Sequence, residues 1–340
     1  MVGRGLAEYA GLNAAAISTA DRTGIERPIS ATGAIVPSLA GMSAEVLAAS
    51  YAACANTVRA RARNFYHGLR LTPEPRRGAI YSIYTWMRAA DDLADAPASA
   101  AERRLRLGHF REQTERVLSG QRPAEGDEAF WSAFGATCAS YPIQHGIFTD
   151  MLDGLDDDLE TVAYRDDEQL HRYCYRVAGT AGLACLWIWG LREGADPEQA
   201  RELALRRGQA FQRTNILRDF AQDYDATPSR VYIPADAFSR RGLTPAAVRA
   251  WERPDDCAAL VLEQAAMTRE HYKASDALES LIDPECSPTL WAMTRIYSGL
   301  LELIEREPQR IASDRRIRLT GTKKASIALG AALWAKVGRW

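Results

Sequence analysis

Helical segments follow one another through most of this chain, and prolines and glycines separate them. Within the segments apolar residues recur every three or four positions, the period of an α-helix, and no stretch clearly alternates as a β-strand does. Ser43 is a suitable N-cap for the first segment, and Ser287 followed by Pro288 is a suitable start for a late one. We therefore predict an all-α protein with helices over residues 44–69, 76–95, 101–118, 127–140, 142–159, 167–191, 197–224, 244–251, 255–281 and 288–307.

The predicted helices form a single domain over residues 44–320, around a central space, because no linker or internal repeat divides them. Residues 1–43 are rich in small and hydroxyl side chains but lack the apolar core of a secretory signal, so we expect a poorly ordered head. Residues 321–340 mix apolar side chains with lysine and arginine. This basic amphipathic tail is expected either to pack on the domain or to contact a membrane surface.

The composition excludes several classes of function. Among 340 residues, 44 Asp and Glu oppose 42 Lys and Arg, and a net charge of −2 argues against a nucleic-acid partner. The six cysteines form no CxxC pair and the five histidines no HExxH, so neither a disulfide framework nor a zinc site is expected. No run approaches the ~18 apolar residues of a spanning helix. We expect a cytoplasmic protein, with membrane association through the tail as an open alternative.

The first cluster of functional candidates is Asp91, Asp92 and Asp95, after the apolar run YSIYTWMRAA. Asp91 and Asp95 are four residues apart and therefore share one face of a helix. Carboxylates at the C-terminal end of a helix are unfavourable against its dipole, so this cluster needs a compensating cation unless the helix end is frayed and solvated. Arg88 is a nearby candidate for an ion pair or a phosphate contact.

The second cluster is Asn215, Asp219 and Asp223, accompanied by Arg218. These residues step by four over two helical turns and form a narrow polar stripe among apolar neighbours. An ordinary surface stripe would more often carry lysine and glutamate pairs. A third acidic run, residues 156–158, lacks this spacing, and we expect it to be a solvated helix end or loop.

Two oxygen-rich faces on opposite sides of a cavity predict a site for divalent cations and diphosphate. Mg²⁺, or Mn²⁺ in its place, takes a few carboxylates from the protein and completes its shell with substrate oxygens. An apolar interior beside such a mouth suits a hydrocarbon tail, and aromatic faces tolerate a carbocation. The candidates for that interior are Phe65, Leu69, Tyr81, Tyr84, Tyr173, Leu183, Phe211 and Tyr297.

Three segments carry a resemblance to a known family: ARNFYHGLRLTPEPRRGAIYSIYTWMRAADDLAD, YCYRVAGTAGL and FQRTNILRDFAQDYDATPSRVYIP. They resemble, in order and spacing, the squalene synthase and phytoene synthase family of head-to-head prenyl synthases. The resemblance runs over roughly residues 50–320. It implies the all-α isoprenoid synthase fold, a helical bundle around a central cavity.

The resemblance also implies roles for individual residues. It makes Asp91 and Asp95, with Asp92 adjacent, the Mg²⁺ ligands at the first diphosphate. The remaining roles are Mg²⁺ at the second side (Asn215, Asp219, Asp223), contact with diphosphate (Tyr84, Arg88, Arg218, Tyr297, Arg316, with Arg315 as the alternative to Arg316), and the cavity near the reacting carbons (Tyr173, Gln212). One departure concerns the loop ATPSR before Val231, which lacks the family's more usual Arg-Gly.

The implied reaction joins two identical prenyl diphosphates through a cyclopropylcarbinyl diphosphate to a squalene- or phytoene-type product. Bulky residues at Leu69 and Tyr81 near the tunnel floor favour farnesyl over geranylgeranyl diphosphate. Quenching of the final cation by hydride, water or proton loss stays open, and no GxGxxG motif supports NADPH. The alternatives are a terpene cyclase or head-to-tail prenyltransferase and, more distantly, a non-catalytic helical interaction protein.

Overall fold

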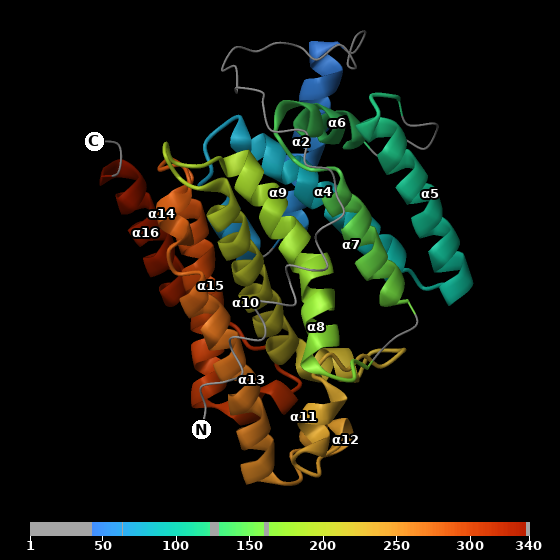
Figure 1. Ribbon diagram of the computed structural model, residues 1–340, viewed down its shortest axis with the longest axis vertical. Helices are drawn as coiled ribbons and strands as arrows, with labels where there is room; N and C mark the ends of the chain where they lie inside the picture. The colour runs from blue at the N-terminus through green and yellow to red at the C-terminus, as the bar shows by residue number, and fades with distance from the viewer. Residues whose placement is uncertain (1–42, 63, 123–128, 160–162, 338–340) are drawn as a thin grey trace. The chain divides into compact units, whose positions relative to one another are not determined.

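The computed structural model describes residues 43–62, 64–122, 129–159 and 163–337, apart from the side chains of residues 64, 65, 67, 336 and 337. Figure 1 shows the succession of its helices. Their bounds are α2 (Ala44–Arg61), α3 (Asn64–Leu69), α4 (Arg76–Ala94), α5 (Ala100–Leu118), α6 (Trp131–Ser140), α7 (Gly146–Asp157), α8 (Asp167–Cys174), the π-helical turn η2 (Tyr175–Gly179), α9 (Thr180–Trp189), α10 (Pro197–Tyr224), α11 (Ala235–Ser239), α12 (Pro245–Ala250), α13 (Pro254–Ala274), α14 (Leu278–Leu281), α15 (Ser287–Arg306), the 3₁₀ turn η3 (Pro308–Ala312) and α16 (Gly321–Val337).

The all-α prediction is confirmed, because the described residues contain isolated β-bridges but no strand. Ser43 caps α2 as predicted, its hydroxyl accepting a hydrogen bond from the Val46 amide at 3.2 Å. The late helix begins differently, because α15 starts at Ser287 itself. The Ser287 hydroxyl donates back to carbonyl oxygens of the preceding turn, including that of Ile282 at 3.1 Å, and is therefore not a cap.

Helix α10 is central to the packing and contacts α9, α13, α15 and the π-helical turn (Figure 1). Its contact with that turn passes through backbone atoms. A methyl group at Gly208 would lie 2.9 Å from the carbonyl oxygen of Ala178, so only glycine fits there. A methyl at Gly182 of α9 would similarly approach the Ala204 carbonyl at 3.2 Å. Small residues thus let α9, η2 and α10 pack at close range.

Two hydrophobic cores flank α10 and fix the helices that carry the aspartates. In the first core, Trp86 of α4 is fully buried and its ring lies 5.4 Å from that of Phe134 and 4.9 Å from that of Phe148. The second core joins α10 to α13 and α15, with Leu260 and Leu300 fully buried. Because α4 is anchored in one core and the second half of α10 in the other, both helices present their polar faces from firmly packed supports.

Helix α16 occupies the predicted tail and packs on α15. Ile327 and Ala331 are buried in that contact, and Trp334 meets Trp291 edge to face at 6.0 Å. Among the described residues, none of the helices combines the length and hydrophobicity needed to cross a bilayer. The predicted head, residues 1–43, lies outside the described residues except for Ser43, and the predicted domain limits stay a prediction.

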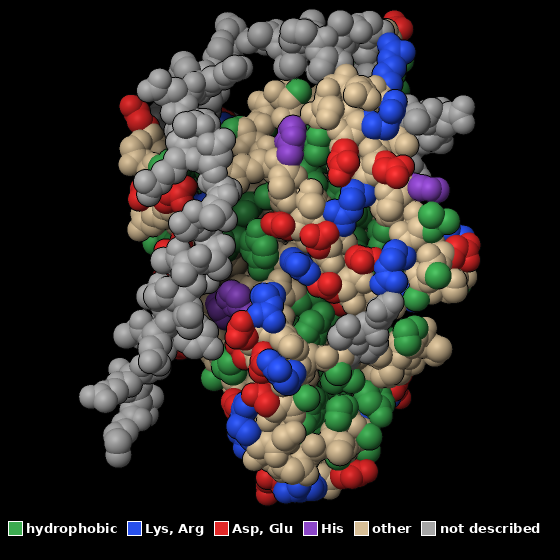
Figure 2. All heavy atoms as spheres, turned by 45° about the vertical axis from the view of Figure 1, so that its right-hand side comes forward, with side chains coloured by type: hydrophobic (Ala, Val, Ile, Leu, Met, Phe, Trp, Pro, Cys, Tyr) green, Lys and Arg blue, Asp and Glu red, His purple; other side chains and the backbone are tan. Residues whose placement is uncertain are grey.

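The surface carries charges of both signs in close alternation. Figure 2 shows a face on which acidic and basic side chains are interspersed rather than separated by sign. Ion pairs contribute to this pattern between α5 and α7, where Arg104 pairs with Asp156 at 3.1 Å and Arg111 with Asp153 at 2.7 Å. Such exposed pairs contribute little stability individually.

Candidate active site

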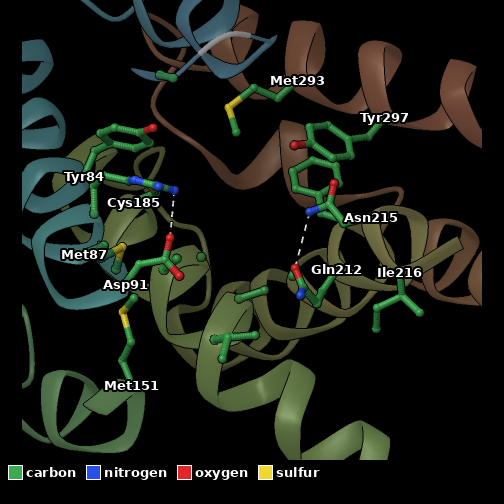
Figure 3. Close-up of a pocket in the computed structure, with 18 of the residues that line it drawn as sticks. Tyr84, Met87, Asp91, Met151, Cys185, Gln212, Asn215, Ile216, Met293 and Tyr297 are labelled. Carbon is green, nitrogen blue, oxygen red and sulfur yellow. Dashed lines mark hydrogen bonds and ion pairs between the residues drawn. The ribbon is translucent and has the colours of Figure 1, made fainter. Parts of the chain in front are cut away.

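One cavity of about 1210 Å³ receives side chains from both aspartate clusters. Asp91 and Asp95 reach it from α4, and the polar stripe of α10 reaches it with all three of its predicted residues. Figure 3 shows Asp91 facing Gln212 and Asn215 across this space, with the hydroxyls of Tyr84 and Tyr297 directed into it. We call the two sides the α4 wall (Asp91, Asp95) and the α10 wall (Asn215, Asp219, Asp223).

On the α4 wall, Asp91 lies at the end of a helix and close to other carboxylates. Its side chain is 38% exposed, and that exposure is to the cavity that it lines. Burial and the neighbouring charge of Asp95 raise the pKa of Asp91 to about 6, against the opposing effect of Arg88. Arg88 pairs with Asp91 at 2.7 Å and also reaches Asp92 at 2.6 Å. This wall therefore concentrates negative charge that its own arginine only partly offsets.

Asp92 is not brought to the cavity with its neighbours. Its carboxylate is 42% exposed and does not line the cavity, but it pairs with Arg88 at 2.6 Å and with Arg61 at 2.8 Å, and both of these arginines line the cavity. Adjacent residues of a helix point about 100° apart, so Asp92 cannot share the face of Asp91 and Asp95. Its predicted part in metal binding stays a prediction that this placement does not favour.

On the α10 wall, Asp219 is held between two arginines. Its side chain is only 16% exposed and receives paired hydrogen bonds from Arg218 and from Arg316, the latter at 2.7 and 2.6 Å. Burial opposes ionisation, but the hydrogen bonds from both guanidiniums outweigh it and hold the pKa of Asp219 below its usual value. Arg316 thus reaches the site from a segment beyond α15, whereas Arg315 is exposed and does not line the cavity.

Asp223 is the electrostatic opposite of Asp219, one helical turn away. Burial and the nearby charge of Asp219 raise the pKa of Asp223 to about 7, although Arg230, Arg316 and Arg218 act in the other direction. Unlike Asp219, it has no ion pair among the described residues. A carboxylate in this position is the one that a cation would stabilise most.

A single residue, Arg230, joins the C-terminal ends of the two walls. Its guanidinium pairs with Asp95 of α4 at 2.6 Å, and its backbone amide donates to the carbonyl oxygen of Asp223 in α10 at 2.8 Å. The two walls therefore approach each other at the mouth of one cavity, as the sequence predicted. The sequence alone does not mark Arg230 as a site residue, because 135 residues separate it from Asp95.

The interior of the cavity is apolar and aromatic. The rings of Phe211 and Tyr297 stack at 4.7 Å, and Leu69, Tyr84 and Tyr173 also line it. The other residues of the lining include Ile80, Ile83, Met87, Met151, Val177, Leu186, Trp189, Ile216, Ile282, Leu290 and Met293. This surface supplies the predicted environment for a hydrocarbon chain beside the polar mouth.

Two of the residues predicted for the interior lie elsewhere. Tyr81 is buried on the other side of α4, where Arg77 and Tyr66 are its charged and phenolic neighbours. Leu183 is buried in the first core and does not reach the cavity. Both predictions were wrong because tertiary packing, and not hydrophobicity alone, decides which face of a helix borders a cavity. The side chain of Phe65 lies outside the described residues.

The third acidic run divides between solvent and site. Its first two residues are surface carboxylates that pair with arginines, as expected. The third, Asp158, instead lines the cavity and accepts hydrogen bonds from Tyr164 at 3.1 Å and Tyr232 at 3.4 Å. Burial raises the pKa of Asp158 to about 6, and hydrogen bonds from tyrosines, first Tyr173, limit the rise. The prediction of a solvated end was therefore wrong for this residue.

The tyrosines around Asp158 form a stacked group. The ring of Tyr173 lies 5.1 Å from that of Tyr232 and 5.2 Å from that of Tyr164. Burial, followed by the charge of Asp158, raises the pKa of Tyr173 well above its ordinary value, so its phenol is neutral. Nothing in the local sequence pairs Asp158 with Tyr232, which follows 74 residues later.

The donor set suits a hard divalent cation. All the candidate ligands on the two walls are oxygens, which Mg²⁺ and Mn²⁺ prefer. The side-chain oxygen of Asn215 is buried and has no hydrogen-bond partner among the described residues, whereas its amide nitrogen donates to Gln212 at 3.3 Å (Figure 3). Within the described residues, no three acidic, histidine or cysteine side chains converge into a complete metal site. An incomplete protein shell is consistent with Mg²⁺, which usually takes only one or two carboxylates together with substrate oxygens.

Comparisons with known proteins agree with this site. The sequence model of the squalene/phytoene synthase family matches residues 58–323. A phytoene synthase of Mycobacterium tuberculosis is 32% identical over 285 residues, which cover 83% of this chain and 90% of that protein. The chloroplastic phytoene synthase 3 of Zea mays is 32% identical over 261 residues, 76% of this chain, and the match spans only 60% of the maize protein.

Solved structures show the same fold. The crystal structure of a dehydrosqualene synthase superposes with a TM-score of 0.73, at 24% identity, over 86% of this chain and 99% of that one. A squalene synthase from Alicyclobacillus acidocaldarius gives a TM-score of 0.69 at 23% identity, over 79% of this chain and 98% of that one. At these identities the likeness concerns the fold, which is the predicted all-α isoprenoid synthase fold.

Proposed function

This chain belongs to the squalene/phytoene synthase family of prenyltransferases, and on that premise we propose that it condenses two identical prenyl diphosphates head to head. The observation that carries the proposal is one cavity bordered by both aspartate walls at its mouth and by apolar and aromatic side chains inside. Two diphosphate groups need two clusters of charge-bearing ligands, and two isoprenoid tails need a shared dry interior. The aspartate walls support the first condition and the apolar lining of the same cavity supports the second.

The reaction is proposed to require Mg²⁺, with Mn²⁺ as a substitute. Asp91 and Asp95 would hold it on one side, and Asn215, Asp219 and Asp223 on the other. When bound, the cation supplies Lewis-acid stabilisation of the charge on a departing diphosphate. Arg88, Arg218, Arg316 and Tyr84 all line the cavity, and their guanidinium and hydroxyl groups would donate hydrogen bonds to the same oxygens.

The chemistry begins with cleavage of the C1–O bond of one substrate, and diphosphate leaves with the bonding electrons. The C2–C3 double bond of the second substrate supplies the electrons of the new bond to C1, and loss of one proton closes a cyclopropyl ring. We propose that Tyr173 receives this proton while its own passes to Asp158, whose carboxylate is in hydrogen-bonding contact with it. Cleavage of the C–O bond of the second diphosphate and rearrangement then give a 1,1′-linked allylic cation, and loss of a further proton from that cation gives the hydrocarbon. The aromatic faces around the cavity stabilise the carbocations.

For the chain length, we now favour geranylgeranyl over farnesyl diphosphate. The preference for farnesyl depended on both Leu69 and Tyr81 narrowing the tunnel, and only Leu69 lines it. The two relatives compared above, each 32% identical to this chain, are named phytoene synthases. A Leu69→Ala variant is expected to shift product ratios further toward the longer substrate, whereas Tyr81→Phe is expected to leave them unchanged.

The decisive experiment is incubation of the full chain with Mg²⁺ and either farnesyl or geranylgeranyl diphosphate, followed by analysis of the extracted lipids. We expect a C40 hydrocarbon from the C20 substrate alone. Parallel reactions with and without NADPH test hydride quenching, and reactions with isopentenyl diphosphate test head-to-tail elongation. A cyclised product from single substrate molecules, or no C30 or C40 product with either substrate, would contradict the proposal.

Tyr173→Phe and Asp158→Asn are expected to stop proton loss and lower product formation.

A further inference from the structure

Helix α16 has an outer face of a kind that surface helices rarely expose. Leu329 and Leu333 lie one helical turn apart, with 63% and 54% of their surfaces exposed. Ala325, one turn before Leu329, is exposed as well. We call these three residues the α16 face. The opposite side of the helix is also apolar, because Ile327 and Ala331 are buried against α15. A helix that is apolar on both sides is normally covered on both.

Cations surround one end of this face. From residue 315 to residue 337 the sequence contains six lysines and arginines and no acidic residue. Arg315, Arg318 and Lys323 are exposed and make no ion pair among the described residues. The preceding acidic residue, Asp314, is already paired with Arg249. The charge beside the α16 face is therefore uncompensated and positive.

Tryptophans lie where α16 packs on α15. Trp291 of α15 is half-buried and packs against α16, where a methyl group at Gly330 would lie 3.0 Å from its ring. Its partner Trp334 is also half-buried, and the exposed Arg295 lies 5.4 Å above the ring of Trp291.

The α16 face lies close to the cavity. Arg316, Arg318 and Lys324 line the cavity, and Lys324 lies in the first turn of α16. The helix thus runs from the rim of the cavity along α15. A lipid surface in contact with α16 would lie beside the entrance through which isoprenoid tails pass.

We propose that the α16 face docks on the surface of a bilayer containing anionic lipid, with Leu329 and Leu333 inserted and the neighbouring cations at the headgroups. The charge of the surface complements phosphate headgroups, and its leucines complement the acyl region. A second copy of the chain is a poor occupant. A stable dimer interface buries about 800 Å² on each partner, and two leucines and an alanine supply far less apolar surface.

Vesicle flotation of the full chain tests this proposal without any turnover. The probes are vesicles of phosphatidylcholine alone and of phosphatidylcholine mixed with phosphatidylglycerol. We expect binding to the anionic vesicles at low salt and release at high salt, because screening weakens the cationic contribution. The double variant Leu329→Gln, Leu333→Gln is expected to bind at least about tenfold more weakly, and Lys323→Gln about fivefold more weakly.

The matched control is Leu105→Gln, which removes a leucine that is 60% exposed on α5. It should bind vesicles as the unmodified chain does. Thermal melting of each variant verifies folding, and light scattering reports the oligomeric state. Absence of the unmodified chain from anionic vesicles at low salt would overturn the proposal. So would equal binding by the double variant and the Leu105 control, or a dimer that only the double variant loses. The measurement uses no prenyl substrate, so its outcome is independent of the proposed function.

Discussion

The two aspartate walls solve the same electrostatic problem in different ways. On the α4 wall each carboxylate is more than a third exposed and pairs with one arginine, Asp95 with Arg230 and Asp91 with Arg88, which it shares with Asp92. On the α10 wall two arginines pair with Asp219, which is 16% exposed, whereas Asp223 makes no ion pair within the part of the chain that the structure describes. The α4 wall is evenly and weakly compensated, and the α10 wall combines one strongly paired carboxylate with one uncompensated neighbour.

This difference separates two duties that a cation site must perform. Asp219 is ionised at any neutral pH because its arginines hold its pKa low, so it is a permanent anionic support. Asp223 and Asp91 have raised pKa values, about 7 and about 6, and gain most from an added positive charge. We infer that Asp219 organises the arginines, whereas Asp223 and Asp91 respond to cations.

The largest effect is expected from Asp219→Asn. Turnover should fall at least about a thousandfold, since several kcal/mol of charge stabilisation depends on this residue. The free energy of unfolding should also fall by about 3 kcal/mol, because Arg218 is left buried beside a neutral partner. Turnover assays and urea denaturation measure the two effects. A variant with an unchanged free energy of unfolding would show that the arginines do not depend on Asp219.

The second prediction concerns Asp223→Asn, which should stabilise the protein when Mg²⁺ is chelated. The folded pKa of Asp223, about 7, exceeds its ordinary value of 3.8. The stability linked to this group is therefore fully present below pH 4 and is lost as the pH rises through 7. Asparagine does not titrate, so the melting temperature of the variant should exceed that of the unmodified chain increasingly between pH 4 and 7.

Added Mg²⁺ should reverse the order of the two melting temperatures, because only the unmodified chain has a carboxylate at position 223 to bind the cation. Melting curves in EDTA and in Mg²⁺, at pH 5 and pH 8, provide the comparison. Equal melting temperatures at pH 8 in EDTA would refute the idea that Asp223 is uncompensated.

The third prediction concerns the ion pair between Arg230 and Asp95, where the two walls meet. Arg230→Gln and Asp95→Asn, singly and together, form a double-mutant cycle for the ion pair that joins α4 to the loop after α10. Because Asp95 is 44% exposed, the coupling energy should be only about 0.5 kcal/mol. Denaturation of the four proteins measures it. Strictly additive effects would mean that Arg230 holds the loop through its backbone amide alone.

The smallest effect is expected from Asp92→Asn. The side chain does not line the cavity, and its partners Arg61 and Arg88 keep their own places in the lining, so turnover should stay within about threefold of that of the unmodified chain. Asp91→Asn, one residue earlier, is the matched variant and should lose far more. Equal losses in both variants would restore Asp92 to the cation site.

The sequence predicted what local geometry decides. Helical periodicity placed the helices, and spacing by four placed Asp91 with Asp95 and Asp219 with Asp223 on single faces. Helix breaks were less predictable, since the π-helical turn within 167–191 has no marker as clear as proline. Cavity lining was also less predictable, because the packing of whole helices directed Tyr84 inward and Tyr81 away.

The remaining site residues depend on contacts between distant segments. Arg230 reaches Asp95 only because the loop after α10 returns to the end of α4. The same loop brings Tyr232 to Asp158. An isolated β-bridge between Ala163 and Val231 links the loop to the segment after Asp158. No pattern in a single sequence specifies such pairs, because their energies arise only once the tertiary structure has formed.

The glycine contact between α10 and the π-helical turn limits how this chamber can change. At Gly208 the two elements touch through main-chain atoms, with no side chain to exchange for a smaller one. This contact between α10 and η2 cannot widen unless a whole helix moves, and any residue larger than glycine at position 208 would separate the two elements. The cavity can therefore be enlarged for a bulkier substrate only at other lining residues. Replacing a residue such as Met87 or Met293 by a smaller one creates room without separating the helices.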